Sequence, residues 1–148
     1  KITDSKCEAG KTPGSMARLH QAIYESHPGI HAIVMAQPPN LMGFGISGTP
    51  FNVNTIPESL MFLKEVELLP FETDFSKLKN LIVSKSKTSN ALILRHNAVL
   101  TTGKSLLQAY DRLEIAEFGA KSLMMGKAIG KFKPISRQQA DEIRKMYP

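Results

Sequence analysis

The sequence predicts a layered fold of the α/β or α+β class, and two observations support this. Short apolar runs with the composition of buried strands alternate with longer segments whose apolar residues recur every three or four positions. Glycine and proline punctuate the boundaries between many of these segments, as is typical of turns. Stacking helices against a sheet buries the apolar surfaces of both, so a layered arrangement follows.

The predicted elements follow one another in a regular order. After a loop over 1–14, we expect helices over 15–27, 58–66, 75–87, 104–128 and 136–146, and strands over 31–37, 68–71, 91–95 and 99–102, with a tight turn at 96–98. The stretch 38–57 is rich in proline and glycine, so we expect it to be irregular. Ser15 is the expected N-cap of the first helix, and Ser136 and Gln139 have capping-box spacing.

The longest predicted helix needs an apolar face to pack against the sheet. Its expected inner face consists of Leu106, Leu107, Tyr110, Leu113, Ala116, Phe118 and Leu123. Ser105 precedes this helix and is sufficient to explain how the helix starts.

The bulk properties predict one globular domain over residues 1–148, with 42% hydrophobic and 22% charged residues. The net charge of +6 fits a solvated basic surface, and it leaves open the binding of phosphorylated small molecules. The basic stretch 77–87 has no interleaved aromatic residues, which argues against nucleic acid. No apolar run approaches the roughly 18 residues of a membrane span. A single cysteine, Cys7, rules out an internal disulfide and favours a cytoplasmic setting.

Several short motifs resemble functional sites, but a purely structural explanation fits each of them better. The segment 43–48 has the spacing G-x-G-x-x-G, but prolines flank it where a dinucleotide site needs a strand and a helix. The segment 103–105 resembles the end of a phosphate-binding P-loop, but the required glycine at position 98 is alanine. His20 is expected to be a buried, hydrogen-bonded core residue, whereas His96 lies in a tight turn where a functional group can be presented.

Four segments together resemble the class II aldolase/adducin family, which includes fuculose-, rhamnulose- and ribulose-phosphate aldolases and epimerases. They are residues 11–16 leading into 19–24, residues 27–34, residues 55–59, and residues 92–103 leading into 106–114. The resemblance spans nearly the whole chain and implies a three-layer α/β/α domain with a central, mostly antiparallel sheet. The chain resembles the C-terminal two-thirds of such a domain.

The resemblance also implies a particular chemistry. In the family, three histidines hold a zinc ion that polarises the substrate oxygens, and a glutamate acts as general acid and base. In this sequence, Met16 stands at the glutamate position, and Met35, Gln37 and Asn97 stand at the histidine positions, with His96 displaced by one. Methionine, glutamine and asparagine are poor zinc ligands, so we expect no zinc and no other cofactor.

The first functional hypothesis is therefore a non-catalytic relative that binds a phosphorylated sugar or a partner, with Gly14 and Ser15 at the phosphate-contact position. The second is an active sugar-phosphate aldolase or epimerase with an altered site that uses His96 and Ser15. The third is a structural assembly module, as in adducin. The resemblance further implies a homo-oligomer, commonly a tetramer, while neither a nucleic acid nor a membrane is an expected partner.

Overall fold

The computed structural model of the chain describes residues 2–3, 6–7 and 9–147. Its central sheet has the strand order β3 (Ala32–Ala36), β6 (Ala98–Gly103), β5 (Ala91–Leu94) and β4 (Val66–Leu69). The strand β6 pairs antiparallel with both neighbours, and β4 pairs parallel with β5. The predicted mostly antiparallel sheet is thus confirmed. Two short strands, β1 (Ile2–Thr3) and β2 (Lys6–Cys7), form a separate antiparallel pair.

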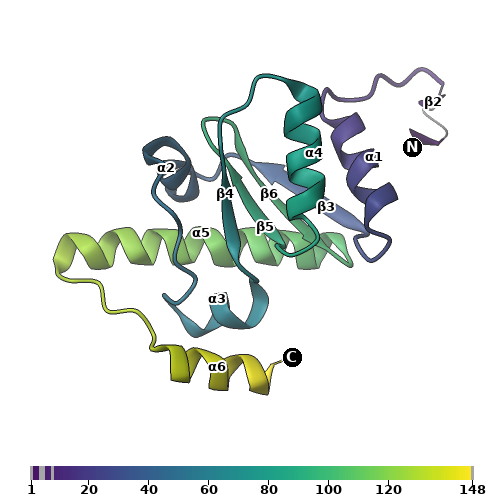
Figure 1. Cartoon of the computed structure of the whole chain (residues 1–148). Helices are drawn as coiled ribbons and strands as arrows, with labels where there is room; N and C mark the ends of the chain where they lie inside the picture. The colour runs from purple at the N-terminus through teal and green to yellow at the C-terminus, as the bar shows by residue number, and fades with distance from the viewer. Residues whose placement is uncertain (1, 4–5, 8, 148) are drawn as a thin grey trace.

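Helices cover both faces of the sheet (Figure 1). On one face lie α1 (Ala17–Ser26) and α4 (Phe75–Lys85), which pack against each other and on the sheet. The other face carries α2 (Pro39–Ser47) and the long α5 (Leu106–Ile129). The short α3 (Pro57–Phe62) packs against α5, and α6 (Arg137–Met146) packs against α3. This confirms the three-layer α/β/α architecture.

The central strand β5 shows how the sequence specifies these layers. All four of its residues are buried, and alternate side chains of a strand point to opposite faces. Leu92 and Leu94 accordingly join the apolar cluster under α1 and α4, whereas Ala91 and Ile93 join the cluster under α2 and α5. A strand buried on both faces is a continuous apolar run, which is why the run 91–94 was predicted correctly.

The stretch predicted to be irregular before Pro57 instead contains the helix α2, so that prediction was wrong. Pro39 occupies the first helical turn, where a missing N–H costs nothing, and Gly48 ends the helix in the left-handed conformation with φ of 72°. Gly45 lets α2 approach the sheet, because a Cβ atom there would lie 3.2 Å from Cγ2 of Ile93. The glycines and prolines that suggested a loop thus shape the ends and the packing of a helix.

A carboxylate from α5 also stabilises the start of α2. Glu117 accepts hydrogen bonds from the backbone N–H groups of Asn40 and Leu41, both at 2.9 Å, and from the Asn40 side-chain amide at 2.6 Å. These N–H groups are among those that a helix cannot satisfy internally. The cap is 76 residues distant in sequence from Leu41, so no local pattern predicts it.

The predicted inner face of α5 was only partly correct. Leu113, Ala116 and Leu123 are buried, but Leu106, Leu107, Tyr110 and Phe118 are exposed by 53–69%. The buried face instead includes Ala109, Gly119 and Ala120. Small residues allow close approach, since a Cβ atom on Gly119 would lie 3.0 Å from Oγ of Ser59.

Three element ends also differ from prediction. The N-cap of α1 is Met16 and not Ser15, and Met16 makes no side-chain capping bond, since its thioether is only a weak hydrogen-bond acceptor. The helix predicted over 58–66 ends at Phe62, and β4 lies two residues earlier than predicted. Proline lacks an N–H for the sheet, so β4 ends before Pro70. The capping box of Ser136 and Gln139 is confirmed.

Candidate functional site

The three positions that the resemblance assigns to metal ligands lie together at one end of the sheet. Met35 lies near the end of β3 opposite Leu100 of β6, and Gln37 follows β3. The Gln37 side-chain amide donates a 2.7 Å hydrogen bond to the backbone carbonyl of Asn97, in the turn between β5 and β6. The antiparallel pairing of β3 with β6 thus brings positions 35, 37 and 97 to the same place. We call this the ligand-position end of the sheet.

Both methionines near this end belong to the apolar layer. Met16 and Met35 are half-buried and pack against the same cluster of leucines and isoleucines under α1 and α4. Position 16 therefore offers no carboxylate that could accept or donate a proton. Thioethers among aliphatic side chains act as flexible packing material.

His96 is the single imidazole in the β5–β6 turn. Its backbone adopts a left-handed conformation with φ of 54°, which is uncommon for residues other than glycine, although histidine is among the more tolerant types. The side chain is exposed, and its ring packs edge-on against Phe71, with ring centroids 5.7 Å apart. This contact directs the ring toward the loop after β4.

The residues at this end do not fit the family's zinc ion. Zinc sites use thiolate, imidazole or carboxylate ligands, usually at least three from the protein. Across residues 9–147, no three histidine, cysteine, aspartate or glutamate side chains lie close enough together to hold a metal. The amide of Gln37 is already engaged with the backbone of Asn97. The donor set at this end is therefore limited to His96 and weak ligands.

The two residues predicted to contact a phosphate lie immediately before α1. Gly14 and Ser15 are both exposed, and the Gly14 carbonyl accepts a 3.0 Å hydrogen bond from the Ala17 N–H. They precede Met16, which shares its apolar cluster with Met35. The structure therefore places this exposed turn at the start of α1, next to the apolar layer that α1 shares with α4.

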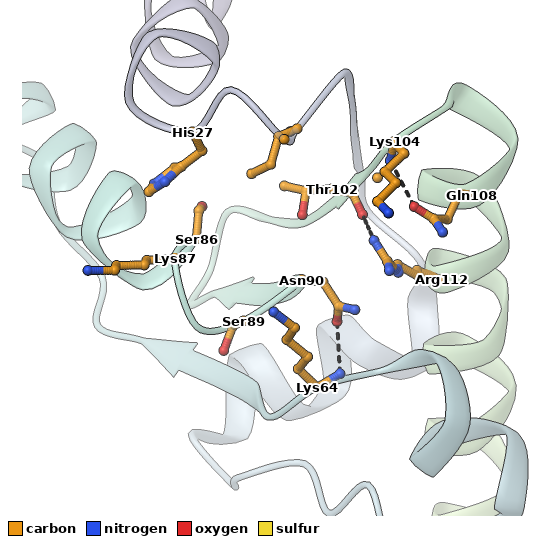
Figure 2. A pocket seen from close by; sticks show the side chains of 13 residues that line it. His27, Lys64, Ser86, Lys87, Ser89, Asn90, Thr102, Lys104, Gln108 and Arg112 are labelled. Carbon is orange, nitrogen blue, oxygen red and sulfur yellow. Dashed lines mark hydrogen bonds between the residues drawn. The ribbon is translucent and has the colours of Figure 1, made fainter. Parts of the chain in front are cut away.

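The opposite end of the sheet contains a cavity of about 340 Å³ that sequence analysis missed. It lies where β4 and β5 begin and β6 ends, and its lining includes Lys64, Lys87, Lys104 and Arg112. Not one of its lining residues is an aspartate or a glutamate. Figure 2 shows the Lys64, Lys104 and Arg112 side chains approaching from three different segments, whereas Lys87 extends away from them. We call this cavity the basic pocket.

Arg112 is the cation of the basic pocket whose side chain is held by hydrogen bonds to described residues. Its Nη1 donates to the Thr102 carbonyl at 2.6 Å and its Nε donates to the Phe62 carbonyl at 3.2 Å. Burial lowers the pKa of its guanidinium, but arginine stays protonated in proteins. Asn90 supports the same region by accepting from the Lys64 backbone N–H at 3.0 Å and donating to the Phe62 carbonyl at 2.9 Å.

The other histidines play different parts. His27 lines the basic pocket, but its Nε2 lies 2.7 Å from the Val83 carbonyl, so this nitrogen must donate the hydrogen bond. His20 was expected to be hydrogen-bonded, and this was wrong. Its buried Nε2 finds no partner within the part of the chain that the structure describes, and burial lowers its pKa.

No helix in the described part of the chain has the length and apolar character needed to cross a membrane.

Residues 1–124 match the family model described as "Class II Aldolase and Adducin N-terminal domain". Among curated proteins, the chain is 26% identical over 120 residues to an L-fuculose phosphate aldolase of Methanocaldococcus jannaschii, covering 80% of this chain and 65% of that protein. The corresponding protein of Methanococcus vannielii is 27% identical over 112 residues, covering 74% and 59%. The chain thus spans less than two-thirds of the length of these relatives.

Solved structures show the same fold. The chain superposes on an L-fuculose 1-phosphate aldolase with a TM-score of 0.83 at 17% identity, covering 95% of this chain and 66% of that chain. A putative aldolase/epimerase/decarboxylase from Klebsiella pneumoniae gives a TM-score of 0.82 at 21% identity, with coverage of 93% and 68%. A sugar-phosphate aldolase from Thermotoga maritima gives 0.72 at 27% identity, with coverage of 86% and 59%.

Proposed function

Because this chain belongs to the class II aldolase and adducin N-terminal domain family, we propose that it binds a phosphorylated sugar without cleaving it. The observation that carries the proposal is the side-chain chemistry at the ligand-position end of the sheet. Met35, Gln37 and Asn97 converge there, yet none offers the imidazole that zinc would need. Met16 likewise replaces the carboxylate that would move a proton.

The ligand class follows from the relatives and from the groups that remain. The curated relatives are named L-fuculose phosphate aldolases, which indicates a phosphorylated sugar. Ser15 retains a hydroxyl, and the exposed turn at Gly14 and Ser15 carries backbone N–H groups that can donate to phosphate oxygens. Binding requires these donors and a complementary shape, whereas cleavage would also require stabilisation of the negative charge that develops on the substrate oxygens.

The decisive experiment measures zinc, binding and cleavage on the same preparation. After zinc loading and dialysis, we expect no retained zinc, calorimetric binding of L-fuculose 1-phosphate, and no carbon–carbon cleavage of that sugar. Ser15→Ala should weaken binding, while Ser122→Ala, on the distant part of α5, should leave it unchanged. About one zinc per chain, measurable cleavage, or no binding of the sugar phosphate would contradict the proposal.

A second candidate function is assembly with copies of the same chain, and one observation favours it. Four apolar side chains of α5 that sequence periodicity places on one stripe, Leu107, Tyr110, Phe118 and Met125, are exposed by 53–69%. Glu114 and Lys121 fall on the same stripe and interrupt it, so the candidate interface consists of exposed apolar side chains between charges. Sedimentation equilibrium should detect an oligomer that Leu107→Lys together with Phe118→Lys dissociates. A monomeric parent protein would contradict this function.

A further inference from the structure

The basic pocket holds positive charges that form no ion pair with any residue that the structure describes. Four of its lining residues are cationic, and the lining contains no carboxylate. The ion pairs found across residues 9–147 join Lys85 to Glu67 and Arg144 to Asp141, so none involves a pocket residue. Arg112 is half-buried, whereas Lys64, Lys87 and Lys104 are exposed, so solvent weakens the repulsion among these charges and a bound anion would relieve what remains.

The hydrogen bonds of Arg112 leave part of its guanidinium free. The carbonyls of Phe62 and Thr102 occupy two of the five N–H donors that an arginine carries, and they fix the plane of the group. The amino groups of Lys64 and Lys104 make no hydrogen bond within the described residues. A fixed guanidinium with unused donors beside free ammonium groups is suited to oxyanion recognition.

A buried hydroxyl adds a further unsatisfied polar group. Ser89 lines the basic pocket, is only 2% exposed, and its Oγ has no hydrogen-bond partner among the described residues. Because this Oγ is almost completely inaccessible, Ser89 forms part of the cavity wall and is not one of the groups that would contact a bound anion.

The size and lining of the basic pocket indicate the class of ligand. A volume of about 340 Å³ accommodates only a small molecule. No aromatic ring other than the imidazole of His27 lines it, and that ring is bonded to Val83 on α4, so a platform for stacking nucleic-acid bases is absent from the lining. We propose that the basic pocket, through Lys64, Lys104 and Arg112, binds a small phosphorylated molecule at a site separate from the ligand-position end of the sheet.

The test uses inorganic phosphate and pyrophosphate, so its outcome does not depend on whether the chain binds a sugar phosphate. Isothermal titration of the full chain at low ionic strength should show one site for inorganic phosphate and a tighter one for pyrophosphate, because more cations are then engaged. The variant Lys64→Gln/Lys104→Gln should weaken pyrophosphate binding about tenfold or more. Lys131→Gln, which removes a positive charge from the exposed segment after α5, should change it by less than about twofold.

A second variant distinguishes a loss of binding from a loss of folding. Gly29 lines the basic pocket, and a Cβ atom there would meet nothing within 4 Å, so Gly29→Asp introduces a carboxylate without steric conflict. It should also weaken pyrophosphate binding, whereas Ser15→Ala should not. Absence of binding for both anions at millimolar concentration, or binding that neither pocket variant weakens, would overturn the proposal. Tighter binding of a short oligonucleotide than of pyrophosphate to the same lysines would overturn the small-molecule assignment.

Discussion

The two ends of one sheet differ in the side chains that they bring together. At the ligand-position end, Met35 packs on an apolar layer and the Gln37 side chain bonds to the backbone of Asn97, so uncharged residues occupy the three ligand positions. At the other end, Lys64, Lys104 and Arg112 surround a cavity with no carboxylate in its lining. The same four strands support both ends, so the fold itself does not require either arrangement. Function in this chain depends on which side chains occupy the strand ends.

The backbone fold and the side chains of the candidate sites have to be compared with the relatives separately. The backbone superposes on aldolase structures with TM-scores up to 0.83 in the comparisons above, although sequence identities there are near 20%. Those identities establish the fold alone. The residues that would carry a reaction have to be examined individually, and at the ligand-position end they do not form a zinc site.

The largest expected effect comes from rebuilding the metal ligands. The variant Met16→Glu, Met35→His, Gln37→His, His96→Asn and Asn97→His should retain about one zinc per chain after dialysis, since the backbone already brings three of these positions together. Elemental analysis measures the zinc, and circular dichroism verifies folding. A control with asparagine at positions 35, 37 and 97 should retain none. A folded variant that binds no zinc would show that the backbone at this end has also changed.

The next largest effect concerns the opposite end. A Cβ atom on Gly103 would lie 2.7 Å from the backbone nitrogen of Ala109, and neither backbone can easily shift. We expect Gly103→Ala to lower the free energy of unfolding by about 1–3 kcal/mol and to weaken anion binding at the basic pocket. Urea denaturation measures the loss. The control Gly29→Ala, where space is open, should be nearly neutral, and equal effects of the two substitutions would refute this explanation.

A somewhat smaller effect should follow from weakening the cap on α2. Replacing Glu117 by glutamine removes the charge that accepts three hydrogen bonds from Asn40 and Leu41. We expect a loss of about 1–2 kcal/mol in unfolding free energy. Glu114→Gln, an exposed neighbour on the same helix, is the matched control and should change stability little. If both variants lose the same amount, the capping role of Glu117 is wrong.

The smallest predicted effect is a pH dependence from His20. Burial lowers the pKa of this histidine in the folded state, so the unfolded chain binds more protons as the pH falls through the ordinary histidine range. The contribution of His20 to stability is therefore present above that range and is lost as the pH falls. His20→Gln should reduce the stability difference between about pH 7.5 and about pH 5.5. Identical pH profiles for the parent and the variant would contradict this assignment.

Local patterns predicted much of the fold. The apolar run at 91–94, the helix beginning at Phe75 and the capping box at Ser136 were all correct, because each depends on residues close together in sequence. The helix α2 was missed because its start depends on Glu117, far along the chain. The exposed side of α5 was taken for its inner side because large apolar residues outweighed the small ones that pack.

The two candidate sites differ in how far sequence could predict them. The meeting of positions 35, 37 and 97 was expected only through family resemblance, and the pairing of β3 with β6 explains it physically. The basic pocket had no sequence signal. Its cations come from the segment before β4, the segment after α4, the residue after β6 and the first third of α5, and no spacing rule connects these. Lys104 belongs to a P-loop-like segment without the required glycine, and that pattern does not predict the cavity.

The long helix α5 also has a mechanical consequence. Arg112 lies in the basic pocket, and Glu117 accepts hydrogen bonds from the start of α2, just beyond the end of β3. The helix α5 therefore contacts both ends of the sheet. The two residues are separated by about 7.5 Å along the helix axis at 1.5 Å per residue. Any sliding of the helix along its axis would therefore displace both contacts together, in the same direction and by the same distance. The two ends of the sheet have separate side chains, but the same helix, α5, contacts both of them.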